Sequence, residues 1–389
     1  MKKYLVVIIA LFAASLISYA LFKNRGALPA VLPPAPIETN NSNTQAKNDL
    51  GLNIPAGFSI DIFAQNLDGP RDLVIDSAGT LLASIPTKGK VVAVVDENGD
   101  GKSDKTIDIL TNRDKPHGLA FFDGQLFVAE ETKLTRFNWD VQKLEAKADK
   151  VLFTLPYGGR HFTRTIAFKD DGTMYVSIGS TCDVCHEKDP FQASVIVSDH
   201  DGTSPRLFAK GLRNAVFITV EEKSQKLWGV EMGRDNLGDT IPPDEINILE
   251  EDKNYGWPNC YGAQVPDKKF KASLGNSDCQ NTQVPAYPLC AHCAPLGLAF
   301  INSDEFDKNS QGDLLLSLHG SWNSTKPVGY KIIKLKREGD KLVSQEDFIT
   351  GFLKGNQVSG RPVDLAFSPK GELFISDDKA GVIYRLRRQ

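Results

Sequence analysis

The sequence predicts an all-β protein built by repetition of one strand–turn–strand unit. A polar turn, usually with Gly, lies between two short apolar runs six times, at 71–84, 117–129, 165–177, 214–230, 296–317 and 363–376. Gly supplies the positive φ that such turns require. A repeat of about 40–60 residues that contains only short strands is typical of a propeller blade. Because there are six copies, we expect a six-bladed β-propeller of four-stranded antiparallel blades.

One further strand is expected at 58–63, before the first unit, and another at 381–386, after the last. Pairing between them would complete the sixth blade and hide strand edges that invite aggregation. The composition agrees with one large core, since 41% of the 389 residues are hydrophobic. The net charge is −4 and no basic block is present, so we expect no nucleic-acid partner.

The first 50 residues differ from the repeats. Basic residues flank an uncharged run at 4–22. Its length is close to the ~20 residues that span a bilayer, so residues 1–25 are either a signal peptide or an N-terminal membrane anchor. Residues 26–50 are expected to be a flexible linker, and residues 51–389 the propeller. Both alternatives predict a periplasmic or extracellular protein, attached to the membrane through residues 4–22 if they are retained.

The six cysteines fit an exported protein, because disulfides persist in oxidising compartments. Two C-x-x-C pairs and one pair within a long insertion are present, namely Cys182/Cys185, Cys290/Cys293 and Cys260/Cys279. Disulfides within these three pairs are one interpretation. The two C-x-x-C pairs could instead bind zinc, although they belong to different blades. Residues 182–186 also match the C-x-x-C-H pattern of covalent haem attachment.

Four groups of polar residues stand where predicted inner strands begin or end, which is where the loops of a propeller meet at one mouth. His is the usual base near neutral pH, and the planar fork of Arg suits a carboxylate or a quinone oxygen. Each group alone could be structural, but four at equivalent positions predict one shared site. The groups contain His161 and Arg164, then Arg213 and Asn214, then His319, and finally Arg361.

These groups resemble the soluble glucose and sorbosone dehydrogenase family, whose members are six-bladed propellers that use pyrroloquinoline quinone (PQQ). The resemblance runs from about residue 51 to the C-terminus. It is most similar to the sorbosone-type branch in the His-x-Thr-Arg phrase at 161–164 and the His-Gly-Ser-Trp phrase at 319–322. The other matching phrases are at 171–179, 211–214, 244–249, 254–258, 294–300 and 360–364.

The resemblance implies roles for individual residues. His161 would take the proton of a sugar's anomeric hydroxyl while hydride leaves C1 for the quinone. Arg213 would hold the quinone oxygens and the substrate, with Asn214 beside it. Arg361 would pair with a PQQ carboxylate, because PQQ carries three carboxylates and an Arg-lined mouth suits them. The remaining candidates for cofactor binding are His319 and Arg164.

The resemblance also implies Ca²⁺, which takes oxygen ligands and would bridge PQQ to main-chain carbonyls of Met232, Gly233 and Arg234. A second candidate Ca²⁺ loop follows from the residues alone, because oxygen-bearing side chains alternate there as they do in calcium loops. These residues are Asp96, Asn98, Asp100 and Asp104. The closing Glu of an EF-hand is missing, since Ile107 occupies its position, so a solvated hairpin tip is the alternative.

Three positions depart from the glucose enzymes of this family. Those enzymes carry an acid where this chain has Ser180, a Lys where it has His319, and a second Arg where it has Val363. Fewer cationic contacts would weaken PQQ binding. A non-catalytic propeller that binds a glycan or a protein is therefore one alternative.

Our main interpretation is a PQQ-dependent oxidoreductase that oxidises an aldose or a sugar aldehyde and passes electrons to a quinone or a cytochrome. A second alternative is a calcium-dependent lactonase-type propeller hydrolase. Such sites place acidic and Asn side chains around a central metal, whereas the predicted mouth here contains His and Arg.

Overall fold

The computed structural model describes residues 46–270 and 279–389. The predicted signal peptide or anchor and most of the predicted linker lie outside these residues. In the part of the chain that is described, no helix is long and apolar enough to cross a membrane. The first pairing joins β1 (Ala46–Lys47) to β2 (Asn53–Ile54), so it begins within the last residues of the segment expected to be a linker.

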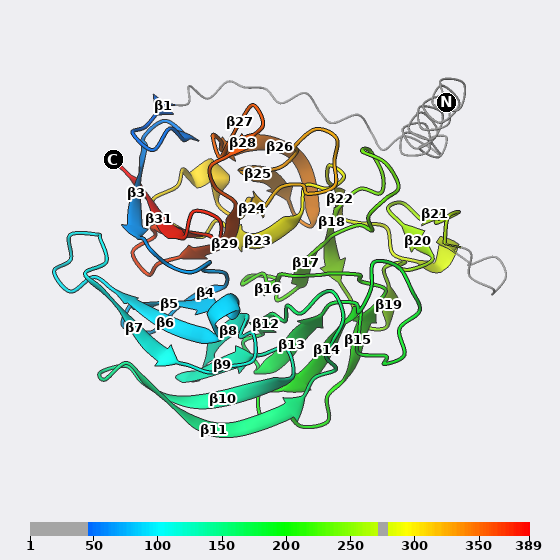
Figure 1. Ribbon diagram of the computed structural model, residues 1–389, viewed down its shortest axis with the longest axis horizontal. Helices are drawn as coiled ribbons and strands as arrows, with labels where there is room; N and C mark the ends of the chain where they lie inside the picture. The colour runs from blue at the N-terminus through cyan, green and yellow to red at the C-terminus, as the bar shows by residue number, and fades with distance from the viewer. Residues whose placement is uncertain (1–45, 271–278) are drawn as a thin grey trace, which may run out of the picture.

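Six antiparallel blades surround a central axis, as the repeats predict (Figure 1). The innermost strands contact one another in cyclic order. They are β4 (Leu73–Ile75), β8 (Gly118–Phe122), β12 (Ile166–Phe168), β16 (Ile218–Val220), β23 (Pro295–Phe300) and β29 (Pro362–Phe367). Each is followed by its partner across a turn: β5 (Leu81–Ile85), β9 (Gln125–Ala129), β13 (Thr173–Ile178), β17 (Leu227–Glu231), β24 (Leu314–Leu318) and β30 (Leu373–Asp377). These pairs are the six predicted units.

The outer half of each blade comes from the segments between the units. The third strands are β6 (Lys90–Val95), β10 (Lys133–Asp140), β14 (Ser194–Asp199), β18 (Glu245–Leu249), β25 (Lys331–Glu338) and β31 (Val382–Arg388). The fourth strands are β7 (Lys105–Leu110), β11 (Glu145–Thr154), β15 (Arg206–Lys210), β22 (Tyr287–Pro288), β26 (Lys341–Ile349) and β3 (Phe58–Ala64).

The ring closes as expected. β3, from the start of the propeller, pairs with β31, at the end of the chain, in a register that runs from Phe58 opposite Arg388 to Ala64 opposite Ile383. One departure lies in the third blade, where β19 (Lys253–Asn254) adds a short parallel fifth strand to β15. Two-residue strands form two small hairpins outside the blades, β20 (Cys260–Tyr261) with β21 (Val265–Pro266) and β27 (Leu353–Lys354) with β28 (Gln357–Val358).

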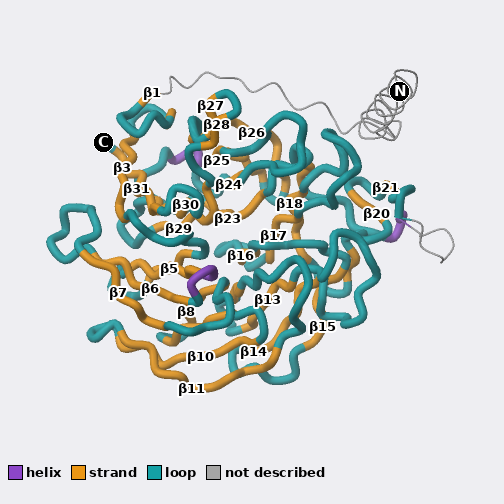
Figure 2. The backbone as a smooth tube through the Cα atoms, viewed as in Figure 1, coloured by secondary structure: helices purple, strands orange, loops and turns teal. Residues whose placement is uncertain are grey.

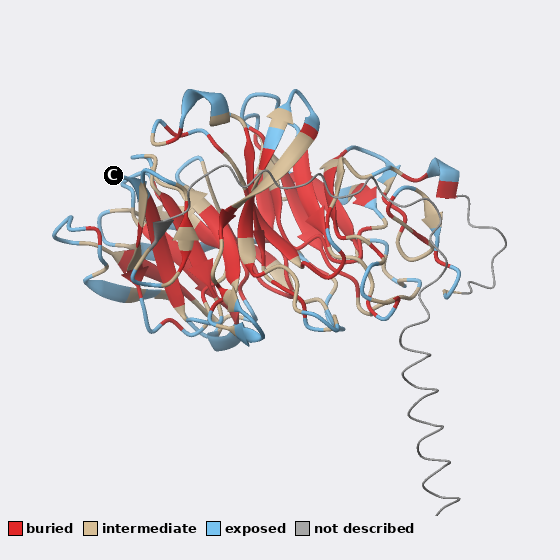
Figure 3. Ribbon diagram, turned by 90° about the horizontal axis from the view of Figure 1, so that it is seen from above, coloured by how far each residue is buried: buried red, intermediate tan, exposed pale blue. Residues whose placement is uncertain are grey.

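Loops and turns make up most of the rest of the described chain, as Figure 2 shows. Helical structure there is limited to three short 3₁₀ turns, η1 (Pro86–Lys88), η2 (Cys279–Asn281) and η3 (Lys308–Ser310). Seen from the side, buried residues fill the middle of the sheets, and exposed residues gather in the loops at their ends (Figure 3). The short, alternating strands therefore place their apolar side chains between neighbouring blades.

Polar groups also join the blades close to the axis. Asp364 accepts a hydrogen bond from the main-chain nitrogen of Leu73 (2.8 Å), and Asp72 accepts one from that of Leu119 (3.2 Å). Asp72 and Asp364 share a hydrogen bond of their own, and burial raises the pKa of both carboxyl groups. Gly297 is required here, because a Cβ would lie 2.5 Å from the Cα of Asp364. The inner strands are thus held in a tight ring, which sets the positions of the loops at the mouth.

Candidate active site

The first group at the mouth is organised around Asp235, in the loop after β17. Its carboxylate pairs with Arg213 (3.2 Å) and with Arg160 (2.7 Å). It also accepts a hydrogen bond from Asn323 (3.0 Å), which lies in the loop after β24, four residues beyond His319. These contacts bring the loop before β12, the loop before β16 and the loop after β24 together at one end of the channel.

His161, in the loop before β12, has a defined protonation pattern. Its Nδ1 lies 2.9 Å from the Ser180 hydroxyl and 3.1 Å from the Ser180 main-chain oxygen. The hydroxyl donates to the main-chain oxygen of Cys182 (2.7 Å), so both Ser180 oxygens can only accept from His161. Nδ1 therefore carries the proton and Nε2 keeps its lone pair. Burial, reinforced by the charges of Arg213 and Arg160, lowers the pKa of His161 to about 3, so the ring is neutral near pH 7.

Arg213 is held on three sides, and its side chain is only 4% exposed. Nε donates to the main-chain oxygen of Asp183 (3.0 Å), and Nη2 donates to the Asp183 carboxylate (2.9 Å) and to Asp235 (3.2 Å). Nη1 donates to the main-chain oxygen of Met232 (3.3 Å). The guanidinium is thus fixed in one plane, and much of its charge is balanced by two carboxylates.

Asn214 follows Arg213 and is buried beside His161. Its main-chain nitrogen donates to the Glu231 carboxylate, and its Nδ2 contacts the sulfur of Met232 (3.6 Å). Its Oδ1 is buried without a hydrogen-bond partner in the described chain. A Cβ at Gly179 would lie 2.6 Å from the Cβ of His161 and 2.9 Å from Asn214 Oδ1, so only Gly allows this close approach.

His319 and Arg361 form a second group at the same mouth. Arg361 donates to the main-chain oxygens of His319 (3.1 Å) and Gly320 (2.5 Å), so its fork holds the backbone of that loop. His319 Nε2 lies 2.9 and 3.0 Å from the two carboxylate oxygens of Asp378, which also pairs with Arg71 (2.7 Å). Burial lowers the pKa of His319 to about 4, although Asp378 opposes this change. The neutral ring therefore uses Nε2–H to donate to Asp378.

Arg164 does not face the mouth. Its side chain is buried, and its guanidinium donates to the main-chain oxygens of Pro156 (2.8 Å), His161 (3.0 Å) and Thr163 (2.9 Å). This geometry corrects our expectation of a cofactor contact, because both Nη groups of the buried Arg164 donate to the backbone of its own loop. Arg164 supports the segment that presents His161.

The stretch expected to bind Ca²⁺ lies directly after β17. The main-chain oxygen of Met232 accepts a hydrogen bond from Arg213, and the main-chain nitrogen of Gly233 donates to Asp244 (2.9 Å). Burial raises the pKa of Asp244 to about 7. The side chain of Arg234 turns to Asp267 (2.8 Å). The stretch from Met232 to Arg234 therefore lies next to the hydrogen bonds that hold Arg213.

The second candidate Ca²⁺ loop, between β6 and β7, is a hairpin tip. The carboxylates of Asp96, Asp100 and Asp104 each accept hydrogen bonds from main-chain N–H groups of the same loop, and Asn98 donates to Asp104 (3.1 Å). Their oxygens do not meet in a group of three with all ligand atoms within 4.8 Å of one another. These contacts describe a hairpin tip, and Ca²⁺ binding at this loop stays a prediction.

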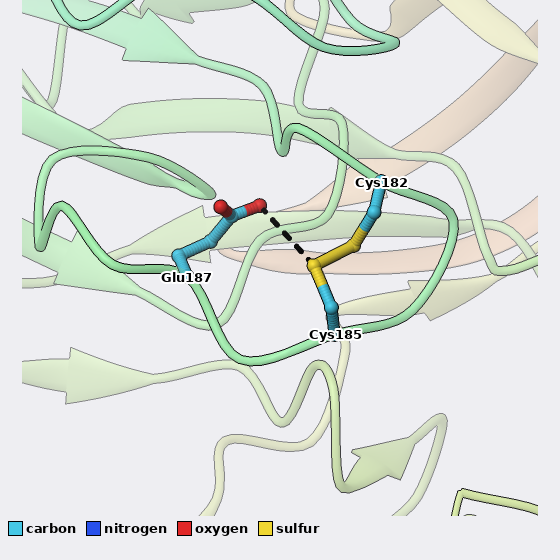
Figure 4. A group of neighbouring side chains, drawn as sticks. All are labelled: Cys182, Cys185 and Glu187. Carbon is cyan, nitrogen blue, oxygen red and sulfur yellow. Dashed lines mark hydrogen bonds between the residues drawn. A yellow bond between two sulfur atoms is a disulfide. The ribbon is translucent and has the colours of Figure 1, made fainter.

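All three predicted disulfides are present, Cys182–Cys185, Cys260–Cys279 and Cys290–Cys293. Disulfide-bonded cysteines have no thiolate for zinc and no thiol for haem attachment, so both alternatives are wrong. Within the described ranges, Cys182, Cys185 and Glu187 form the one group of three His, Cys, Asp or Glu residues close enough to share a metal (Figure 4). Its sulfur atoms are bonded to each other, so the group is a structural loop.

Sequence reasoning missed the acids that neutralise the mouth. Asp183 lies between the two cysteines of the first disulfide, and Asp378 directly follows β30. The place of Asp378 at the mouth could have been predicted from the sequence. The second strand of each unit ends at the mouth, so polar residues just after a second strand belong to the candidate site, as His319 does. No comparable signal marks Asp183, because its position depends on how a long loop folds back.

The comparisons with known proteins give the family and the fold. The TrAA12-like family model matches residues 52–389, and the chain belongs to the TrAA12-like family. An uncharacterised protein of Borreliella burgdorferi is 30% identical over 360 residues, which cover 86% of this chain and 90% of that protein.

Two further relatives are more distant. A pyrroloquinoline quinone-dependent pyranose dehydrogenase of Coprinopsis cinerea is 24% identical over 87% of this chain, but this chain spans only 54% of its length. The solved structure of the Trichoderma reesei carbohydrate-active enzyme of family AA12 superimposes with a TM-score of 0.74 at 22% identity, over 86% of this chain and 97% of that one. That likeness shows the propeller fold.

Proposed function

We propose that this protein is an exported dehydrogenase that uses PQQ to oxidise an aldose or a sugar aldehyde, with His161 as the base. The observation that carries the proposal is the neutral His161 ring, whose Nδ1 is bound to Ser180 and whose Nε2 is left to accept a proton. The ring stands beside a fixed arginine in a TrAA12-like chain. The PQQ-dependent Coprinopsis relative supports the cofactor.

The residues at the mouth fit a planar, tricarboxylate ligand. Arg160 is a partly exposed cation at the mouth, since its side chain is 40% exposed and lies over the ring of Trp322 at 5.3 Å. Trp322 is itself 67% exposed, so this pair offers an aromatic face and a charge. Asn214 Oδ1, which has no hydrogen-bond partner among the described residues, adds a buried acceptor for an N–H or O–H group of the ligand. Arg213, Asn214, His319 and Arg361 would hold PQQ, and the carbonyls of Met232, Gly233 and Arg234 would hold Ca²⁺ beside it.

The proposed mechanism divides the work between the cofactor and the chain. When bound, PQQ supplies the quinone that accepts the hydride from C1 of the sugar. His161 Nε2 accepts the proton of the anomeric hydroxyl, so the sugar loses two electrons and two hydrogens. Arg213 has one Nη1–H beyond its bonds to Asp183, Asp235 and Met232, and this N–H would stabilise the negative charge that develops on an oxygen held against it. A quinone or a cytochrome would then receive the electrons.

One alternative has a specific observation in its favour. Asp183 and Asp235 already pair with Arg213, and Asp378 already accepts the Nε2–H of the neutral His319, so groups that a PQQ carboxylate would use are engaged. A propeller that has kept the scaffold and binds a glycan or a protein without catalysis would show the same pairing. The same ion pairs weigh against a lactonase-type site, whose acids and Asn would have to surround a metal.

A direct assay separates these functions. Purified protein is mixed with PQQ and Ca²⁺, and a panel of aldoses is tested with a dye acceptor while the melting temperature is followed. We expect dye reduction and a rise in melting temperature that both require PQQ. No oxidation of any sugar, together with no change in melting temperature, would leave the non-catalytic alternative.

A further inference from the structure

The loop closed by the Cys182–Cys185 disulfide touches both halves of the proposed catalytic pair. Only Asp183 and Val184 separate the two cysteines. The main-chain oxygen of Cys182 accepts the Ser180 hydroxyl, and Asp183 contacts Arg213. One small loop therefore lies behind the base and beside the arginine.

The contact with the base sets its tautomer. The Ser180 hydroxyl has a single proton, which it donates in a hydrogen bond to the main-chain oxygen of Cys182 (2.7 Å). The oxygen that faces His161 then offers only lone pairs, so Nδ1 must donate. Which nitrogen of a histidine holds the proton is set by the hydrogen bond that the other one makes. The position of the Cys182 carbonyl thus helps to leave Nε2 free.

Asp183 contacts Arg213 through both its main-chain oxygen and its carboxylate. Its main-chain oxygen accepts from Arg213 Nε (3.0 Å) and from Trp257 Nε1 (3.1 Å). Its carboxylate accepts from Arg213 Nη2 (2.9 Å) and from the main-chain nitrogen of Asp235 (2.9 Å). Two parallel bonds from one side of a guanidinium fix its plane as well as its position.

The base of the loop is held separately. Glu187 accepts hydrogen bonds from the main-chain nitrogen (2.6 Å) and the hydroxyl (2.8 Å) of Thr181. Removal of the disulfide would leave these bonds in place but would free the backbone between them, including the Cys182 and Asp183 carbonyls. The cross-link therefore acts on the part of the loop that faces the site.

We propose that Asp183 is a positioning residue for Arg213, and that the Cys182–Cys185 disulfide holds the loop in the conformation that aligns Arg213 and His161. This inference deepens the proposed function and rests on it for its catalytic meaning. Supporting groups behind catalytic side chains commonly set their geometry in this way.

The first test removes the Asp183 side chain. Asp183→Ala should weaken PQQ binding and lower turnover, each by about 10- to 100-fold, since a hydrogen bond to a charged group is lost. Asp183→Asn should restore part of both, because its amide oxygen can still accept. Asp189→Asn is the matched control, since Asp189 lies in the same loop and caps only the main-chain nitrogen of Phe191. Wild-type affinity and turnover in Asp183→Ala would overturn the role of Asp183.

The second test uses nuclear magnetic resonance of the apoprotein, so it does not depend on activity. The chain has four Trp residues, and the Trp257 indole N–H signal is assigned by its loss in Trp257→Phe. Cys182→Ser/Cys185→Ser should shift this signal and the Arg213 Nε–H signal, whereas Cys260→Ser/Cys279→Ser should shift neither by a comparable amount. Asp183→Asn should shift the Arg213 Nη2–H signal, because Nη2 donates to the Asp183 carboxylate. It should leave the signals of Arg213 Nε–H and Trp257, which are both bound to the main-chain oxygen of Asp183.

The outcomes are distinguishable. If the folded Cys182→Ser/Cys185→Ser variant keeps both signals and wild-type PQQ affinity, the disulfide has no positioning role. If that variant does not fold, Asp183→Asn decides, since an unshifted Arg213 Nη2–H signal overturns the proposal. If wild-type protein neither binds PQQ nor oxidises sugars, the proposed function fails, yet shifted signals would still establish the loop as the support of Arg213.

Discussion

His161, in the loop before β12, and His319, directly after β24, lie at the same mouth, and both are neutral because burial lowers the pKa of each ring. They differ in which nitrogen is engaged. His161 is bound through Nδ1 to Ser180, whereas His319 is bound through Nε2 to Asp378. The first ring has its outer nitrogen free, and the second has its outer nitrogen fixed against a carboxylate. A histidine at a propeller mouth is thus a base or a support according to the partner it meets.

The arginines follow the same division. Arg213 lies beside the free histidine and is held by Asp183 and Asp235, which fix its plane. Arg361 lies beside the fixed histidine and holds the backbone of the His319 loop. We therefore expect catalytic effects on the His161 side and binding or structural effects on the His319 side.

The largest effect should come from His161. His161→Gln removes the proton acceptor and should lower turnover by about 10²–10⁴-fold, while PQQ still raises the melting temperature. Steady-state kinetics at saturating PQQ and Ca²⁺ measure this change. His200→Gln, in an exposed turn after β14, is the matched control. Full activity in His161→Gln would end the assignment of His161 as the base.

A smaller effect is expected on the His319 side. His319→Gln should weaken PQQ binding by about tenfold, with turnover at saturating PQQ close to wild type, because the ring supports the site and does not take the proton. A titration of the melting temperature against PQQ gives the affinity. A loss of turnover as large as that of His161→Gln would show that the two sides are not divided as we describe.

The sequence explains the blades better than it explains this division. Alternating apolar runs around Gly-containing turns predicted all six units, and the ends of those strands predicted that His161, Arg213, His319 and Arg361 share a mouth. Position at a strand end does not tell where a long side chain turns, and Arg164 turns into its own loop. Acids such as Asp183 also could not be placed, since long-range loop folding decides which cation they meet.

The titration of the two histidines should be unusual. In the apoprotein, neither ring should show a midpoint between pH 5 and 8, because their pKa values are lowered to about 3 and about 4. The unfolded chain binds these protons from about pH 6.5 downward, so the stability that the two neutral rings contribute is lost as the pH falls below that value. The imidazole C–H signals, followed from pH 4 to 8, measure the titration midpoint of each ring. A midpoint near 6.5 for His161 would contradict the buried, neutral ring.

The smallest effect concerns a region away from both histidines, the carboxyl pair of Asp72 and Asp364. Burial raises the pKa of Asp364 to about 7 and that of Asp72 well above its usual value. The native state therefore holds protons that the unfolded state loses above about pH 4, and stability falls as the pH rises toward 7 and beyond. Asp72→Asn, which keeps a donor toward Asp364, should raise the melting temperature at pH 8 and change it little at pH 5. An equal change at both values would contradict the shared proton.

The closure of the ring by β3 and β31 has a consequence for biosynthesis. β31 ends at Arg388, one residue before the end of the chain, whereas its partner β3 begins at Phe58. The sixth blade cannot form until β31 has been synthesised, so the nascent chain carries an open edge until that point. Such late, long-range pairing slows folding and lengthens the time during which a chaperone can hold the chain. A truncation before Val382 would remove β31 and leave β3 without its partner strand.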